Sequence, residues 1–195
     1  MAEATGWGGV RVFTVGHSTR PLEELVAILR AFDVRVLADI RTIPRSRHNP
    51  QFEGAALAAS LRARHLRYAH VPELGGLRKP RADSENAGWR NASFRGFADY
   101  MQTSGFALGL EKLRALAQGV DDGPVAIMCA EAVPWRCHRS LVADALSVRG
   151  ARVEHATSPT HASPHHLTPF AVVDGERITY PPEATAPERP ARKKA

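Results

Sequence analysis

The chain has little cysteine and no long apolar segment. Its 195 residues include two cysteines, Cys129 and Cys137. So few cysteines exclude a disulfide framework, and in a reducing cytosol both are expected to be thiols. No apolar run approaches the roughly 18 residues that cross a bilayer, and the first residues lack the pattern of a secretory signal. These absences predict a cytoplasmic protein without a membrane partner.

Acidic residues are fewer than basic ones. The formal net charge is +6 and the isoelectric point is near 9.9, which favours a phosphate-bearing ligand or nucleic acid as partner. Part of the excess lies in residues 183–195, a Pro-rich stretch predicted to be a disordered basic tail. Aromatic residues are scarce beside the basic loop, where Phe52 is the nearest. A stacking platform for single strands is therefore not indicated.

Short apolar runs alternate with amphipathic segments along the rest of the chain. The runs at 10–15, 34–40, 66–71, 125–129 and 152–156 predict strands. Helices are expected from Pro21 to Phe32, over 55–64, 94–101 and 106–118, and from near Cys137 to Gly150. Such alternation predicts an α/β fold, a mainly parallel sheet of about five strands with helices on both faces. Residues 1–182 would form one domain, with a C-terminal extension over about 158–182.

Polar residues follow four of the predicted strands. Because the carboxyl ends of parallel strands meet at one edge of a sheet, where ligands bind, these residues are expected to share one pocket. They are Gly16, His17, Ser18, Thr19 and Arg20 after the first strand, Asp39, Arg41, Arg45, Arg47 and His48 after the second, His70, Pro72, Glu73, Leu74, Gly75 and Gly76 after the third, and Cys129, Glu131, Arg136, Cys137, His138 and Arg139 after the fourth.

Several of these residues have two interpretations. Gly16 and the next helix N-terminus could bind an anion, or could form a plain turn in which Ser18 or Thr19 caps the helix. The arginines from Arg41 to Arg47 match phosphate in charge and geometry, or form a solvated loop. Asp39 is either an acid–base group or a partner that orders Arg41. In the C-terminal region, His166 is the one histidine kept as a candidate.

The segment from Cys129 to Arg139 carries the sharpest chemical signal. Cys137 is expected near a helix N-terminus among basic residues, an environment that lowers a thiol pKa and favours a nucleophile. Cys129 is either a small core residue or part of the site. A phosphatase-like loop is disfavoured because Glu131 would place a carboxylate inside an anion cradle. Glu131 or His138 is the predicted proton carrier.

Zinc is the alternative chemistry for this segment. Cys129, Cys137 and His138 could bind it with one further ligand. Their spacing matches no common zinc knuckle, however, and adjacent residues rarely point at one ion. The sequence therefore assigns no metal ligand and no cofactor.

Taken together, several motifs resemble one family. They are GHSTR, LADIRTIPRSRHNPQF, PELGG, CAEAVPWRCHR and HLTPFAVVDGERITYPP. In combination they resemble the proteins called domain of unknown function 488, over about residues 11–182. The resemblance implies an α/β fold without a firmly established activity. It also implies a site at Cys129, Glu131, Cys137, His138 and Arg139, with Gly16, His17, Ser18, Asp39 and Arg41 as neighbours.

Three functional hypotheses follow from these observations. The first is an enzyme acting on a phosphate-bearing substrate such as a nucleotide or nucleic acid, with Cys137 as nucleophile or oriented helper. The second is a non-catalytic nucleic-acid-binding module, whose affinity would fall steeply with added salt. The third is a metal-dependent enzyme.

Overall fold

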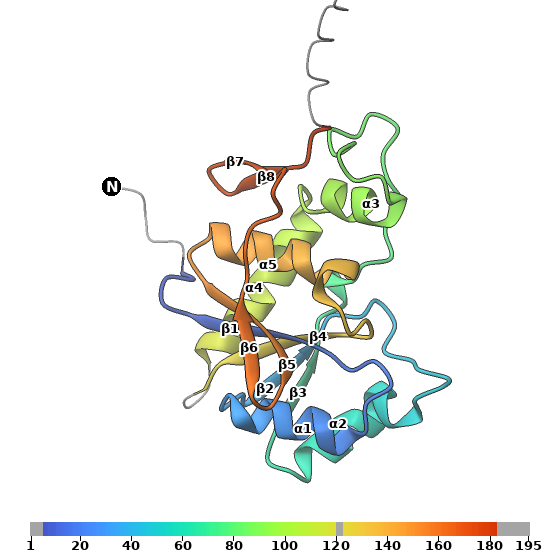
Figure 1. Ribbon diagram of the computed structural model, residues 1–195, viewed down its shortest axis with the longest axis vertical. Coiled ribbons are helices and arrows are strands. Elements are labelled where there is room, and N and C mark those ends of the chain that lie inside the picture. The colour runs from blue at the N-terminus through green and yellow to red at the C-terminus, as the bar shows by residue number, and fades with distance from the viewer. Residues whose placement is uncertain (1–5, 120–122, 183–195) are drawn as a thin grey trace, which may run out of the picture.

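A six-stranded sheet runs through the middle of the molecule in the computed structural model (Figure 1). The structure describes residues 6–119 and 123–182, so the predicted tail lies outside the described residues. In spatial order the strands are β3 (Arg67–His70), β2 (Val36–Asp39), β4 (Val125–Cys129), β1 (Arg11–Gly16), β5 (Arg152–Ser158) and β6 (His161–Pro164). All neighbours pair in parallel except β5 and β6. The predicted α/β fold is confirmed, and β6 is an additional, antiparallel edge strand.

The central strand β4 explains why the sheet is covered on both faces. Each of its five residues is buried, as expected for a parallel strand with helices on either side. Its register places Cys129 opposite Gly16 of β1 and Met128 opposite Asp39 of β2. The ends of β1, β2 and β4 are therefore level, and the loops that follow them leave from the same edge of the sheet.

Helices lie on both sides of this sheet. On one side are α1 (Leu22–Ala31) and α2 (Gly54–Arg62), whose apolar residues pack with Phe13, Leu37 and Met128 of the strands. On the other side are α3 (Ala92–Tyr100), α4 (Ser104–Gln118) and α5 (Arg139–Val148), which pack with Val12, Val36 and Ile127. Alternate residues of β1, β2 and β4 thus belong to two separate hydrophobic cores. Figure 1 shows the two helical layers below and above the sheet.

Two helix starts differ from the sequence prediction. Ser18 and Thr19 do not cap α1, because Pro21 occupies the N-cap position without a side-chain cap. Ser18 instead has a φ of 47°, a left-handed conformation that turns the chain between β1 and α1. The helix expected near Cys137 begins at Arg139.

The C-terminal extension folds back over α5. It contains β6 and a hairpin of β7 (Val172–Asp174) and β8 (Arg177–Thr179). Asp144 of α5 is fully buried and accepts hydrogen bonds from the Tyr180 hydroxyl at 2.8 Å, from Thr168 Oγ1 at 2.7 Å and from Thr168 N at 3.0 Å. These bonds attach the extension to the domain.

Histidines continue this polar contact toward the sheet. His165 Nε2 lies 2.8 Å from Asp144 Oδ1, and its Nδ1 lies 3.0 Å from His155 Nε2. His155 Nδ1 in turn lies 2.8 Å from the Thr14 hydroxyl of β1. We call the group of Asp144, Thr168, Tyr180, His165 and His155 the Asp144 cluster.

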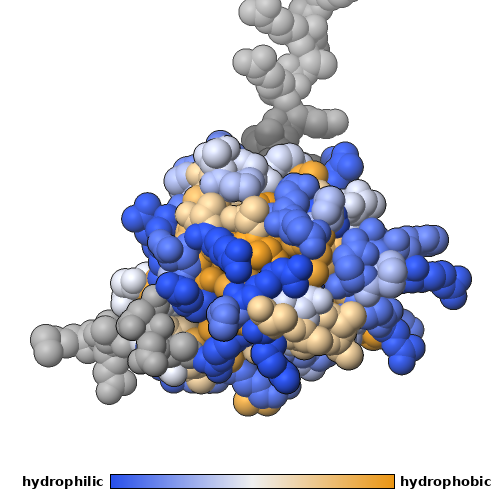
Figure 2. Space-filling view, turned by 90° about the horizontal axis from the view of Figure 1, so that it is seen from below, coloured by the Kyte–Doolittle hydropathy of each residue, from blue (hydrophilic) through white to orange (hydrophobic). Residues whose placement is uncertain are grey.

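Polar side chains dominate the surface near α1 and α2. Seen from their side of the molecule, hydrophilic residues surround a smaller hydrophobic area (Figure 2). Within the described ranges, no helix is both long enough and apolar enough to cross a membrane.

Candidate functional site

A pocket of about 590 Å³ lies where the loops after the parallel strands meet. Its lining comes from segments far apart in the sequence: residues after β1, after β2, beyond β3, at the start of α3, and on both sides of the loop between β4 and α5. The lining residues are His17, Ser18, Thr19, Arg41, Thr42, Ile43, Ser46, Asn49, Gly76, Leu77, Ser93, Phe94, Cys129, Ala130, Glu131, Arg136, Cys137 and His138.

Many of the residues predicted for the site meet at this pocket, and others do not. His17, Ser18, Arg41, Cys129, Glu131, Cys137 and His138 line it. Gly16, Asp39, Arg45, Arg47, Arg139 and His166 are not among its lining residues. The structure thus brings the strand exits together at one place, while several of the predicted binding residues serve the surrounding framework.

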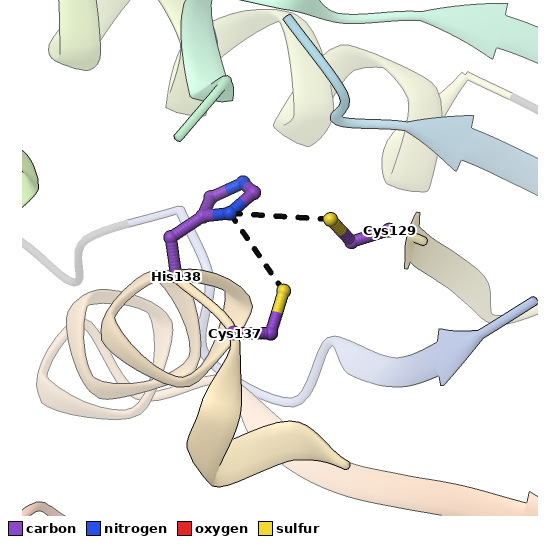
Figure 3. Close-up of side chains that lie close together, drawn as sticks. All are labelled: Cys129, Cys137 and His138. Atoms are coloured by element: carbon purple, nitrogen blue, oxygen red, sulfur yellow. Dashed lines mark hydrogen bonds between the residues drawn. The ribbon is translucent and has the colours of Figure 1, made fainter. Parts of the chain in front are cut away.

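Cys129, Cys137 and His138 form a tight group at the pocket wall, which we call the Cys/His cluster (Figure 3). His138 Nδ1 lies 3.7 Å from Cys137 Sγ and 4.0 Å from Cys129 Sγ. The three atoms all lie within 4.8 Å of one another.

A change of backbone conformation directs two adjacent side chains to the same place. Cys137 is extended, with φ −132° and ψ 142°, whereas His138 is helical, with φ −55° and ψ −17°. Cys137 N donates to Pro134 O at 3.0 Å and so ends the short 3-10 helix Pro134–Arg136. Adjacent residues would otherwise point apart, which is why the sequence pattern argued against their convergence.

The two thiols differ in acidity. The pKa of Cys129 is lowered well below its usual value, first by a hydrogen bond from Cys137 and then by the neighbouring His138. The pKa of Cys137 is raised by its contact with Cys129 and by burial. Cys129 is therefore the more acidic of the two thiols, whereas the sequence-based interpretation gave Cys137 the chemical role.

Arg139 supports the loop that carries the cluster. It is 1% exposed, and its two terminal nitrogens donate to the carbonyls of Glu131 and Ala132. Burial lowers the pKa of its guanidinium. Arg139 was predicted as a catalytic residue, and the structure places it behind the pocket wall.

Gly16 and the adjoining amides also hold this loop. A Cβ at Gly16 would collide with the carbonyl of Glu131, so glycine lets the loop after β4 cross the end of β1. The backbone N–H groups of His17 and Ser18 donate to Cys129 O at 3.0 Å and Ala130 O at 2.9 Å. These two amides therefore bond to the protein and do not form an anion cradle.

Arg41 is engaged within the protein as well. Its Nε donates to Asp39 Oδ1 at 2.9 Å, its Nη2 donates to Phe52 O at 2.8 Å, and its Nη1 lies 3.2 Å from His17 Nε2. Tyr68 donates its hydroxyl to Asp39 Oδ2 at 2.8 Å. Of the two interpretations of Asp39, the geometry matches a partner that orders Arg41.

His17 is held between these groups. It is 2% exposed, it stacks on Phe52 with ring centroids 4.3 Å apart, and its Nδ1 lies 2.9 Å from Ser18 O. Burial lowers the pKa of its imidazole. A neutral ring that donates from Nδ1 to the carbonyl accepts at Nε2 from Arg41, and this places His17 in the pocket wall as a fixed neutral group.

Sequence reasoning expected Gly76 among the strand exits without giving it a role, and it missed the apolar residues of the pocket. Gly76 packs against the His138 ring, because a Cβ on it would collide with Nδ1. Ile43 and Leu77 expose apolar side chains at the pocket, and Phe94 contributes from α3. The motif PELGG contains Gly76, so its second glycine was the available signal, whereas nothing local marks Phe94 as a pocket residue.

The chain was compared with protein-family models, with curated proteins and with solved structures. A family model described as "Domain of unknown function DUF488" matches residues 21–146, a range that contains the Cys/His cluster, Glu131 and Gly76. Comparisons with curated proteins and with solved structures found no match. The first strand and the C-terminal extension lie outside the matched range.

Proposed function

Because the chain belongs to the family described as domain of unknown function DUF488, whose description names no reaction, we propose a function from the site itself. The protein is an enzyme that acts on a small molecule held in the pocket. Its reacting centre is the Cys/His cluster. The observation that carries this proposal is the convergence of two sulfurs and an imidazole at the wall of a pocket of about 590 Å³.

The cluster is poorly explained as a packing element. Its contacts between His138 Nδ1 and the two sulfurs are long, at 3.7 and 4.0 Å. His138 Nε2 is buried without a hydrogen-bond partner among the described residues. A buried polar group without a partner costs about 1–3 kcal/mol. An arrangement that lowers stability in this way beside a pocket is typical of a functional site.

Glu131 is the residue we assign to proton transfer. It lies at the pocket two residues after Cys129, and its side chain is exposed. Its Oε1 accepts only a long bond, 3.4 Å, from Val133 N. A carboxylate in this position can exchange a proton with both ligand and solvent.

The pocket lining favours a small, largely uncharged ligand. Ile43, Leu77 and Phe94 offer apolar surface, and Ser18, Thr42 and Ser93 offer hydroxyls. A phosphate group, the substrate feature predicted from the sequence, would have Arg136 as its main cation, since Arg41 is bonded to Asp39. A phosphate-bearing substrate therefore stays a prediction and ranks below an uncharged one. None of the pocket residues described above favours nucleic acid as the ligand.

Limited alkylation tests the reacting centre directly. The chelator-treated protein is exposed to iodoacetamide at neutral pH, and the modified cysteine is identified by mass spectrometry. We expect Cys129 to be modified faster than an ordinary thiol and ahead of Cys137, because its contacts with Cys137 and His138 lower its thiol pKa. The variants Cys129→Ser and Cys137→Ser serve as the matched pair that separates the two signals. Modification of both cysteines only after unfolding would exclude the cluster as a reacting centre.

A further inference from the structure

We propose that the Cys/His cluster binds one Zn²⁺ ion through Cys129 Sγ, Cys137 Sγ and His138 Nδ1, with a fourth coordination position open to the pocket. This inference rests on the proposed function, because it specifies how the same cluster reacts. It goes beyond that proposal because an enzyme could equally use the sulfurs as nucleophiles without any metal.

The interatomic distances come close to those of a zinc site. Zinc lies about 2.3 Å from thiolate sulfur and about 2.0–2.1 Å from imidazole nitrogen, so tetrahedral geometry separates sulfur from nitrogen by about 3.5–3.6 Å. The corresponding distances from His138 Nδ1 are 3.7 Å to Cys137 Sγ and 4.0 Å to Cys129 Sγ. All three donor atoms lie within 4.8 Å of one another, so side-chain movements of about 1 Å or less would complete the coordination. Figure 3 shows both sulfurs on the same side of the ring nitrogen.

The types of donor atom favour zinc among the common metal ions. Thiolate and imidazole ligands suit zinc, whereas magnesium and calcium prefer oxygen. Structural zinc sites have four protein ligands, and catalytic ones have three with a position left for water or substrate. In the part of the chain that the structure describes, the cluster supplies three such ligands beside a pocket. This is the catalytic pattern.

The surroundings of the imidazole give a second, independent indication. His138 Nε2 is buried without a partner among the described residues, and Nδ1 is the ring nitrogen that faces both sulfurs. Phe97 packs on the ring, with centroids 5.0 Å apart. Gly76 faces Nδ1 without a side chain, at a position where a Cβ would collide with it. The ring is thus held by packing, with Nδ1 directed at the two sulfurs.

A zinc ion in this position would give the pocket a hydrolytic chemistry. Zinc lowers the pKa of a bound water to about 7. In a hydrolysis the water oxygen bonds to the electrophilic centre of the substrate, and its proton passes to the Glu131 carboxylate. That proton then leaves with the departing group. The step needs no oxidant or reductant, and its substrate class is a small molecule with a bond that water can cleave.

Metal content and a spectroscopic substitution test the proposal. The full chain is purified without a metal-affinity step or chelator, and zinc is measured by elemental analysis. We expect about one zinc per chain. After chelation, Co²⁺ is added, and a thiolate-to-cobalt charge-transfer band with strong tetrahedral visible bands is expected. Azide should change the visible bands, because it can occupy the open position.

Variants locate the ion. Cys129→Ser, Cys137→Ser and Gly76→Ala should each weaken zinc affinity at least tenfold in a competition assay with a chromogenic chelator. His161→Gln, at an exposed position of β6 outside the pocket, is the control and should bind zinc as the unchanged protein does. Circular dichroism checks that each variant is folded. If a variant does not fold, the cobalt spectrum of the unchanged chain decides, since it reports thiolate coordination without any substitution.

The possible failures are distinguishable. A folded chain that retains no zinc and gives no thiolate-to-cobalt band overturns the inference, as does zinc affinity that Cys129→Ser and Cys137→Ser leave unchanged. A spectrum insensitive to azide overturns the open position. If zinc is absent but Cys129 is rapidly alkylated, the proposed function stands and the zinc inference falls. If neither is observed, both fall.

Discussion

Two polar clusters, one bound to helix α5 through Asp144 and one just before this helix, differ sharply in their hydrogen bonding. In the Asp144 cluster the carboxylate is bonded to His165, Thr168 and Tyr180 at 2.7–3.0 Å. In the Cys/His cluster, just before the first turn of the same helix, the contacts of the imidazole with the sulfurs are 3.7 and 4.0 Å. Satisfied buried groups rigidify a fold, whereas unsatisfied ones cost stability. The first cluster therefore holds the structure together, and the second is free to bind.

Removal of the Asp144 carboxylate is expected to have the largest effect on stability. Asp144→Ala leaves the donors of His165, Thr168 and Tyr180 buried without their acceptor and should lower the free energy of unfolding by about 3–5 kcal/mol. Urea denaturation measures this change. Asp174→Ala, at an exposed position in β7, is the control and should stay within about 0.5 kcal/mol. A loss below about 1 kcal/mol for Asp144→Ala would contradict a structural role of the cluster.

The next largest effect is expected when a single hydrogen bond of the Asp144 cluster is removed. Tyr180→Phe removes the bond from the hydroxyl to Asp144 Oδ2 but keeps the buried ring. We expect a loss of about 1–2 kcal/mol in the free energy of unfolding. The matched variant Tyr68→Phe removes the bond to Asp39 Oδ2 and should cost less, because Tyr68 is only half-buried. Urea denaturation measures both losses. A larger loss for Tyr68→Phe than for Tyr180→Phe would show that the contribution of these hydrogen bonds to stability does not depend on the burial of the tyrosine.

The Cys/His cluster should matter more for the stabilisation by zinc than for the stability of the metal-free protein. In metal-free protein, Cys137→Ser is expected to lower the free energy of unfolding by about 1–2 kcal/mol, less than Asp144→Ala, because the sulfur is buried but its contacts are long. The same substitution should remove much of the stabilisation that zinc gives to the unchanged chain. Thermal unfolding with and without zinc measures both quantities. A large loss in the metal-free state would identify Cys137 as a structural residue.

The last expected effect is a dependence of stability on pH. Burial, followed by the charges of His165 and Arg139, lowers the pKa of His155 to about 4 from its ordinary value of 6.5. The unfolded chain therefore binds the proton first as pH falls, so the contribution of His155 is present above about pH 6.5 and is lost toward pH 4. His155→Asn should flatten the fall in stability between pH 6.5 and 5. An unchanged slope in urea denaturation would contradict this.

The sequence predicted the buried parts of the fold better than the exposed ones. The predicted strand 125–129 coincides with β4, because a central strand buried on both faces is a continuous apolar run. The hairpin of β7 and β8 was missed, because it consists of two strands of three residues with largely exposed side chains. A sequence window without a buried face carries no periodic signal.

The site was predictable in location and less so in the role of each residue. Cys129 and Cys137 follow from parallel strand exits, which physical rules bring together. Arg139 stands beside Cys137 in sequence, yet its side chain donates to loop carbonyls behind the pocket. The Asp144 cluster was not predicted, because its partners Thr168 and Tyr180 lie in a distant segment with no local pattern. Contacts of this kind depend on the tertiary fold.

X-ray absorption at the zinc edge tests the central claim most directly, that the Cys/His cluster is a metal-binding reacting centre. For the native chain we predict about two sulfur neighbours at about 2.3 Å and lighter neighbours at about 2.0–2.1 Å, from His138 and a solvent molecule. A spectrum with only nitrogen and oxygen neighbours would contradict the account, because zinc would then be bound away from Cys129 and Cys137.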